Sequence, residues 1–178
     1  MSQTILQVNK INVFYGSSQV LFDMSLDVRQ GETLALLGRN GAGKSTTMKT
    51  IAGVLTPKRG DIQYKGSPIS GRPAHLISRA GVSFVPEDRQ IFPDLSVEDN
   101  LTIAIKNSAE GTKPWNLERV YDMLPLLSPL KNRLGGQLSG GERGRLHLCK
   151  TLISGGNVLL LDEPSNDLDV ETLRALED

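Results

Sequence analysis

Cysteine is nearly absent from this chain of 178 residues, in which Cys149 is the single example. An internal disulfide and a metal site built from a cysteine cluster are therefore excluded, and the composition suits a reducing compartment. An excess of charge is absent too, because 20 basic and 20 acidic residues cancel. Nothing in this balance favours an anionic membrane surface or nucleic acid as a partner, so direct DNA binding is not expected.

Long apolar runs are also missing. No stretch approaches the roughly 20 apolar residues that a membrane-spanning helix needs, and residues 1–10 lack the basic start and apolar core of a secretory signal. The length and the 38% of hydrophobic residues suit one domain with a buried core. We expect a soluble protein made in the cytoplasm.

Short segments with a strand or helix pattern follow one another in the first half of the chain. The predicted strands cover 5–14, 20–28, 61–64 and 81–86, with a turn at 15–18 and a short helix at 75–79. The first two strands are expected to pair antiparallel through the turn. The alternation of strands and helices after them is typical of an α/β domain with a parallel core sheet.

The interval 93–136 contains no strand pattern. Ser96 is placed to cap a helix that runs to about Lys106, and a second helix bounded by prolines is expected over 117–127. We interpret the interval as a helical insertion within the α/β domain, with Trp115 packed in or near it.

The most specific chemical motif is the stretch Gly38–Thr46, which fits G-x-x-x-x-G-K-[ST]. It follows the apolar run 34–37, which is expected to form a strand, and precedes a helix pattern over 46–52. This context makes it a phosphate-binding loop. Its members with expected nucleotide contacts are Gly38, Asn40, Gly41, Ala42, Gly43, Lys44, Ser45 and Thr46.

The residue types of this loop match the chemistry of a nucleotide phosphate. Its glycines let successive backbone N–H groups converge on a phosphate at a helix N-terminus. Lys44 supplies a mobile positive charge for the β- and γ-phosphates, and the Ser45 hydroxyl is short enough to ligate Mg²⁺ beside them.

A second chemical feature lies near the end of the chain, where the apolar run Val158–Leu161 stops at Asp162 and Glu163. A buried strand that ends in two carboxylates suits phosphoryl transfer, with Asp162 in the Mg²⁺ shell and Glu163 orienting or deprotonating the attacking water. The alternative is a pair of solvated acidic residues at a strand end.

Two further features each allow a structural interpretation. Tyr15, just before a glycine turn, is suited to stack on an adenine ring, which is worth roughly 1–3 kcal/mol, but it is equally suited to be a half-buried residue at a strand end. In the stretch Leu138–Glu142 (LSGGE), Ser139 and Glu142 have the spacing of an ordinary capping box.

In their order along the chain, the phosphate loop, LSGGE, the strand ending in Asp162-Glu163-Pro164 and the stretch Ser165–Asp169 (SNDLD) resemble the nucleotide-binding domain of ABC ATPases. The resemblance runs along nearly the whole chain. It implies an α/β fold, a P-loop NTPase of the ABC type, with a mixed sheet, an N-terminal antiparallel β part and an inserted α-helical subdomain. Its expected parts are the β part and P-loop core at 1–92, the helical subdomain at 93–137, and the signature helix, Walker B strand and D-loop at 138–178.

This resemblance also implies roles for individual residues. The expected nucleotide contacts outside the phosphate loop are Tyr15, on the adenine, and Glu87, Ser139, Gly140 and Gly141. Lys44 and Glu163 are expected to be catalytic, and ATP and Mg²⁺ are the expected ligands. Ser139 and Gly141 would reach the γ-phosphate held by a second ABC domain facing head to tail. A partner subunit is therefore implied, with transmembrane permease subunits, and a peripheral place on the inner membrane face, if the protein serves a transporter.

Within the family, two subfamilies are represented. Residues 1–141 resemble the ATP-binding subunit of branched-chain amino-acid importers, notably at Gly38–Gly41 and Val85–Pro93, whereas residues 141–178 resemble the ABC-F proteins that act on ribosomes. A chimera joined near the start of the signature helix is the leading interpretation. The expected function is ATP binding and hydrolysis in such an importer; the alternatives are an ABC-F-like translation factor fragment and an ATP-binding chimera or fragment without turnover.

Two departures from the family pattern bear on hydrolysis. Glu87 stands where most of the family has a glutamine, and a carboxylate can approach Mg²⁺ but cannot donate a hydrogen bond. The chain also stops at Asp178, before the strand and switch histidine of the family, and both His75 and His147 precede Asp162. We expect a C-terminally truncated ABC-type ATPase, and the absent switch histidine leaves open whether its hydrolysis is slow or missing.

Overall fold

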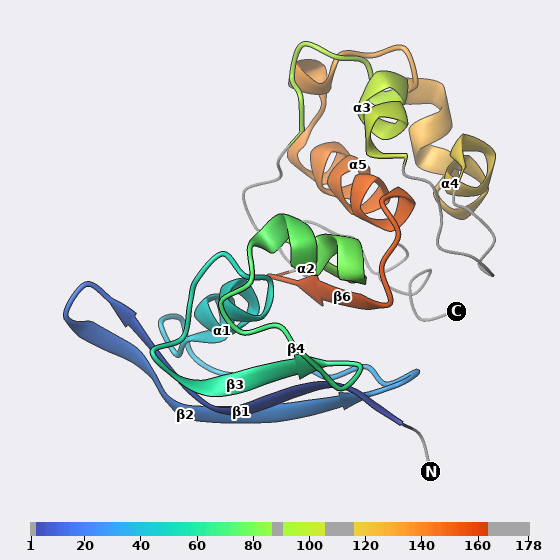
Figure 1. The fold of residues 1–178 in the computed structure, drawn as a ribbon. Helices are drawn as coiled ribbons and strands as arrows, with labels where there is room; N and C mark the ends of the chain where they lie inside the picture. Colours follow the sequence, from blue (N-terminus) through green and yellow to red (C-terminus); the bar gives the residue numbers. More distant parts are fainter. Residues whose placement is uncertain (1–2, 87–90, 106–115, 164–178) are drawn as a thin grey trace. The chain divides into compact units, whose positions relative to one another are not determined.

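The computed structural model describes residues 3–86, 91–105 and 116–163. They fall into two compact units, one within residues 1–84 and one within residues 85–178 (Figure 1). None of the helices in the described ranges is long and apolar enough to cross a membrane. The predictions for Glu87, Trp115 and residues 164–178 lie outside the described residues, and the division into three parts stays a prediction.

The first unit is built on a four-stranded sheet in the order β2-β1-β3-β4. Its strands are β1 (Thr4–Tyr15), β2 (Ser18–Arg29), β3 (Arg59–Tyr64) and β4 (Ser67–Pro68). β1 pairs antiparallel with both β2 and β3, and β3 pairs antiparallel with β4. The predicted antiparallel hairpin is therefore confirmed, with Tyr15 and Ser18 paired across its two-residue turn.

An irregularity in β1 explains its loose alternation of apolar residues. Leu6 and Val8 are buried two residues apart, but the next buried residues are Ile11 and Val13. The pairing register shifts between Val8 and Ile11, where Lys10 adopts a positive φ of 46°. One extra residue at this bulge returns the apolar side chains to the buried face.

Two helices belong to the first unit, α1 (Lys44–Ile51) and α2 (Ala74–Ala80). α1 begins inside the phosphate loop, in agreement with the predicted loop-to-helix order, and its Met48 and Ile51 side chains are buried. It contacts both β1 and β2. The start of the helix is thereby held against the strand pair that ends at Tyr15.

One predicted strand is wrong. Residues 32–39 form no strand, and the Leu34 and Leu37 side chains are 43% and 92% exposed. A strand needs a partner for its N–H and C=O groups, and no described strand pairs with this run. Residues 34–37 include none of the β-branched and aromatic residues that favour an extended conformation, so their apolar character alone does not make a strand.

The second unit is mainly helical. Its described elements are α3 (Val97–Ala104), α4 (Leu117–Met123), two 3₁₀ helices (Pro125–Leu130 and Gly135–Gln137), α5 (Gly140–Ile153) and β6 (Val158–Leu161). The core side chains shared by these helices are Val97, Leu101, Val120, Leu124, Leu127, Leu138, Leu146, Cys149 and Ile153. In this core α5 packs on α3 and on the first 3₁₀ helix (Figure 1).

The helix starts were predicted better than the helix ends. The Ser96 cap of α3 is confirmed, since its side chain accepts from the Asp99 N–H. α4 was predicted to reach residue 127, but it ends at Met123 because Pro125 forces the preceding Leu124 out of the helical region, to φ −126° and ψ 74°. The chain then continues as a 3₁₀ helix.

The strand β5 (Val82–Val85) ends where the second unit begins. Just beyond β6, and within the second unit, the Asp162 N–H donates to the Val85 carbonyl oxygen at 3.1 Å. This bond fixes the backbone of Asp162 at the strand end where the sequence predicts a carboxylate pair.

Candidate functional site: a phosphate loop, a signature turn and an acidic strand end

The phosphate loop enters α1 through two glycines whose backbone conformations only glycine adopts easily. Gly41 and Gly43 have φ values of 83° and 93°, and Gly43 is the N-cap of the helix. No side chain caps this end, and the first turn carries no acidic residue. The backbone N–H groups of the first turn point out of this end of α1, which is therefore suited to an anion.

The loop lies directly against β2. A Cβ placed on Gly43 would lie 2.5 Å from Leu21 Cδ2 and 3.7 Å from the Val20 carbonyl oxygen. Leu21 is itself buried at 4% exposure, so it has little room to withdraw. Gly43 is thus needed twice, for its backbone conformation and for its lack of a side chain.

Lys44 folds back over the loop that precedes it. Its Nζ donates to the Gly38 carbonyl oxygen at 2.9 Å and lies 3.4 Å from that of Arg39. These contacts keep the ammonium beside the loop, and its role toward phosphates stays a prediction. The next residue, Ser45, lies half-buried in the first turn of α1, so the loop presents a cation, a hydroxyl and helix N–H groups, a set that fits a nucleotide phosphate.

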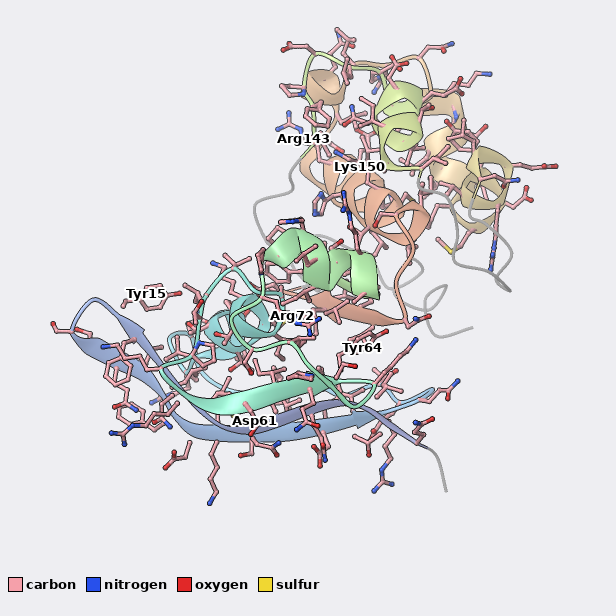
Figure 2. The ribbon with its side chains drawn as sticks, viewed as in Figure 1. Tyr15, Asp61, Tyr64, Arg72, Arg143 and Lys150 are labelled. Carbon is pink, nitrogen blue, oxygen red and sulfur yellow. The ribbon has the colours of Figure 1, made fainter. Side chains whose placement is uncertain are left out.

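Tyr15 lies at the end of β1 and is 48% exposed (Figure 2). Its neighbour Phe14 is covered by Lys58, whose Nζ is 4.4 Å from the ring centroid. Tyr15 pairs with Ser18, and three residues further along β2 Leu21 meets the phosphate loop. About 10 Å of β2 therefore separates the residue paired with Tyr15 from the residue that meets the phosphate loop.

The signature turn starts α5. Ser139 is its N-cap and forms a complete capping box with Glu142, so the structural interpretation of this spacing is confirmed. The backbone and side-chain hydrogen bonds from Ser139 lower the pKa of Glu142. Gly140 and Gly141 occupy the first turn, and the Arg143 guanidinium donates to the Gly136 carbonyl oxygen at 3.0 Å. These hydrogen bonds hold the turn from both sides. Its expected nucleotide contacts stay a prediction.

The acidic strand end is partly buried. Asp162 is 6% exposed, and Glu163 has a positive φ of 50°, which is uncommon for a residue with a side chain. The alternative of a merely solvated pair is therefore wrong for Asp162. Within the described ranges, no three His, Cys, Asp or Glu residues gather as a metal site. A Mg²⁺ ion here would depend on phosphate oxygens as well, which is its usual mode.

The structure thus groups the predicted residues by unit. The first unit contains Tyr15 and the loop Gly38–Thr46, and the second contains Ser139–Gly141 with the carboxylates that end β6. Sequence reasoning missed the contact between Asn100 of α3 and Lys150 of α5, the signature helix. A polar residue in a short helix gives no signal that it will be buried.

A comparison with known families identifies the family of the chain. Residues 21–166 match the ABC transporter family, a range that includes the phosphate loop, the signature turn and the acidic strand end. The chain belongs to this family and is an ABC-type ATPase domain, of the kind that binds ATP.

Its relatives include proteins with different printed roles. The high-affinity branched-chain amino acid transport ATP-binding protein BraG of Pseudomonas aeruginosa is 36% identical over 90% of this chain and 69% of BraG. The lipopolysaccharide export system ATP-binding protein LptB of Haemophilus influenzae is 33% identical over 93% of this chain and 70% of LptB. The energy-dependent translational throttle protein EttA of the same species is 36% identical over 99% of this chain, which spans 30% of EttA. The predicted resemblance to both importer ATPases and ABC-F proteins is confirmed.

A solved structure supports the fold. A putative ATP-binding ABC transporter protein from Pyrococcus furiosus superposes with a TM-score of 0.76 at 28% identity, covering 97% of this chain and 84% of that one. The predicted ABC-type P-loop fold is therefore confirmed.

Proposed function

We propose that this chain binds MgATP through the loop Gly38–Thr46 and hydrolyses it to drive transport. The observation that carries the proposal is the uncapped start of α1 at Gly43, with the Lys44 ammonium bound to the Gly38 carbonyl oxygen beside it. On binding, Lys44 exchanges this carbonyl for phosphate oxygens, and the N–H groups of the first turn bind the same anion. Tyr15 stacks on the adenine at the end of β1.

The remaining site residues act around the phosphates. Ser45 and Asp162 hold Mg²⁺, which offsets the negative charge of the phosphate oxygens. Glu163 orients or deprotonates the attacking water, and Glu87 approaches the metal side of the site. Ser139–Gly141 contact the nucleotide of a second ABC domain, so two chains, identical or related, form two composite sites head to tail.

The transport role rests on similarity. BraG, named for branched-chain amino acid transport, shares 36% identity over most of this chain, and we propose an importer of that type, in which the chain works with transmembrane permease subunits on the inner face of the membrane. LptB, named for lipopolysaccharide export, is nearly as similar. The amino-acid substrate is therefore the part of the proposal that transport assays must decide.

The test of the nucleotide site is a pair of lysine variants on one helix. Lys44→Ala is expected to weaken MgATP binding strongly, whereas Lys49→Ala, in the last turn of α1, keeps it. Binding is measured by calorimetry and by the rise of the thermal midpoint with MgATP, with phosphate release assayed in the same samples. If Lys44→Ala binds MgATP as tightly as the parent, the site assignment is wrong.

A second candidate function is favoured by the similarity to EttA, which is named as a translational throttle protein and matches nearly the whole chain. In that case the domain is a nucleotide-dependent module that binds ribosomes. Co-sedimentation separates the two functions: the importer subunit is recovered with vesicles that contain its permease, and the translation factor is recovered with ribosomes. A raised thermal midpoint without phosphate release would instead indicate an ATP-binding module without turnover.

A further inference from the structure

Asn100 is completely buried on α3, at 0% exposure. Its Oδ1 accepts from the Phe92 N–H at 2.8 Å, and its Nδ2 donates to the Phe92 carbonyl oxygen at 2.9 Å. The same Nδ2 lies 3.0 Å from the Ser96 carbonyl oxygen and 3.3 Å from that of Leu95. A side-chain amide that pairs with both backbone groups of one residue replaces a strand partner, so Asn100 fixes the turn formed by residues 91–95.

This turn, the 91–95 turn, is also fixed from the segment that leads into the signature. The Gly135 N–H donates to the Leu95 carbonyl oxygen at 2.9 Å, and the Gly136 N–H donates to that of Pro93 at 2.8 Å. A Cβ on Gly135 would lie 2.7 Å from the Phe92 carbonyl oxygen. Only a residue without a side chain allows this approach, which places the turn directly against the residues that precede Ser139.

Lys150 closes the arrangement from α5. Its Nζ lies 3.4 Å from Asn100 Oδ1 and 4.5 Å from the centroid of the Phe92 ring. A half-buried ammonium over an aromatic face is attracted to the ring as well as to the amide oxygen. α5 therefore contacts the 91–95 turn near the C-terminal end of the helix and has Ser139 as its N-cap.

We propose that Asn100 and Lys150 are positioning residues that join the 91–95 turn to α5, so that the turn and the signature at Ser139 move as one body. The inference rests on the proposed function, in which Ser139 contacts the nucleotide of a second ABC domain. Loss of this link leaves the signature less well positioned, which lowers turnover without affecting nucleotide binding at the phosphate loop.

The variants are chosen to change the link and keep the packing. Lys150→Met removes the charge and retains the apolar stem, and Lys150→Arg keeps a cation that can reach the same partners. Asn100→Asp retains the acceptor for the Phe92 N–H and removes the donor, which tests the other half of the link. Lys131→Met, at an exposed lysine of the same unit, is the matched control.

The first measurement is hydrogen exchange of the full chain without nucleotide. In Lys150→Met and in Asn100→Asp the amides of Phe92 and Gly135 and those of Glu142 and Arg143 are expected to exchange together, about threefold to thirtyfold faster. Lys150→Arg restores the parent rates, and Lys131→Met leaves them unchanged. Faster exchange in the turn with unchanged exchange at Glu142 and Arg143 would show two independent pieces and overturn the proposal.

The second measurement separates binding from turnover. Lys150→Met is expected to lower kcat about tenfold while MgATP affinity stays within about twofold, with recovery in Lys150→Arg. An unchanged kcat, or a loss that appears only in MgATP affinity, would overturn the proposal. If the parent chain itself releases no phosphate, the hydrolysis part of the proposed function fails, and the exchange measurement alone decides whether the turn and the signature move together.

Discussion

Ser139 and Glu142 satisfy each other's backbone amide at the start of α5. The Ser139 N–H donates to Glu142 Oε2 at 2.6 Å, and the Glu142 N–H donates to Ser139 Oγ at 3.3 Å. A hydroxyl that accepts one hydrogen bond still has its own proton to donate. In this structure that proton is directed to the Glu142 carboxylate. If it turns to a phosphate oxygen of a partner-bound nucleotide, the hydroxyl oxygen still caps the helix, and suitable variants separate these two roles.

Ser139→Ala and Ser139→Asn are expected to differ in stability. Alanine cannot accept from the Glu142 N–H, and the loss of an N-cap costs about 1 kcal/mol, whereas asparagine caps as well as serine. Denaturant unfolding measures this difference. Both variants are expected to lose phosphate release, because neither keeps the hydroxyl. Full activity in Ser139→Asn would limit Ser139 to its capping role.

The capping box also predicts a pH dependence of stability. Hydrogen bonds from Ser139 lower the pKa of Glu142 from 4.5, with a smaller contribution from the Arg133 charge. Because the pKa is lower in the folded state, the stabilisation is present above pH 4.5 and is lost as the pH falls through the folded value. Glu142→Gln, which can still accept from the Ser139 N–H, should remove this dependence. Unfolding curves of parent and variant are therefore expected to converge in acid, and a constant difference would contradict the prediction.

The parts of the fold that were predicted correctly are those fixed by local chemistry. The hairpin followed from its alternating apolar residues, and the caps at Ser96 and Ser139 followed from their spacing to an acceptor or donor three residues on. The run 34–37 was predicted as a strand and is none, because strand formation depends on a partner that the run itself does not specify. Asn100 was missed for a related reason, since its side-chain partner is the backbone of Phe92, outside the helix that contains Asn100.

A comparison of Gly43 with Gly31 separates the two requirements on Gly43, a positive φ and the lack of a side chain. Both have positive φ, 93° and 73°, but only Gly43 would place a Cβ against Leu21, whereas nothing lies within 4 Å at Gly31. Gly31→Ala is expected to cost about 1–2 kcal/mol of backbone strain. Gly43→Ala adds about 1–3 kcal/mol of overpacking against the buried Leu21 and weakens MgATP binding. Thermal unfolding with and without MgATP measures both effects, and equal losses in the two variants would show that the contact with Leu21 is unimportant.

Tyr121 is expected to titrate late. Burial and, after it, the Glu98 carboxylate, 3.5 Å from the hydroxyl, together raise its pKa to about 12. A raised pKa in the fold stabilises the protein below the unfolded value near 10, and this contribution is lost as the pH rises toward 12. Ultraviolet titration of the phenol should show the late transition, which Tyr121→Phe removes. Glu98→Gln should lower the pKa, and an unchanged titration in that variant would exclude the charge as a cause.

Cys149 provides a probe of how often α5 opens. The thiol is 0% exposed, and burial raises its pKa to about 12, compared with about 8.5 for an exposed thiol. At pH 8 its thiolate fraction is therefore expected to be on the order of a thousandfold lower in the folded chain than in the unfolded chain. Only the thiolate attacks a disulfide reagent, so this fraction sets the labelling rate. Labelling of the native chain should be slower than in denaturant by at least this factor, with exclusion of the reagent slowing it more. As Cys149 is the single cysteine of the chain, Cys149→Ala gives the blank. Native labelling at nearly the unfolded rate would show that the core around α5 opens freely, and a slower rate with MgATP would show that nucleotide binding closes it.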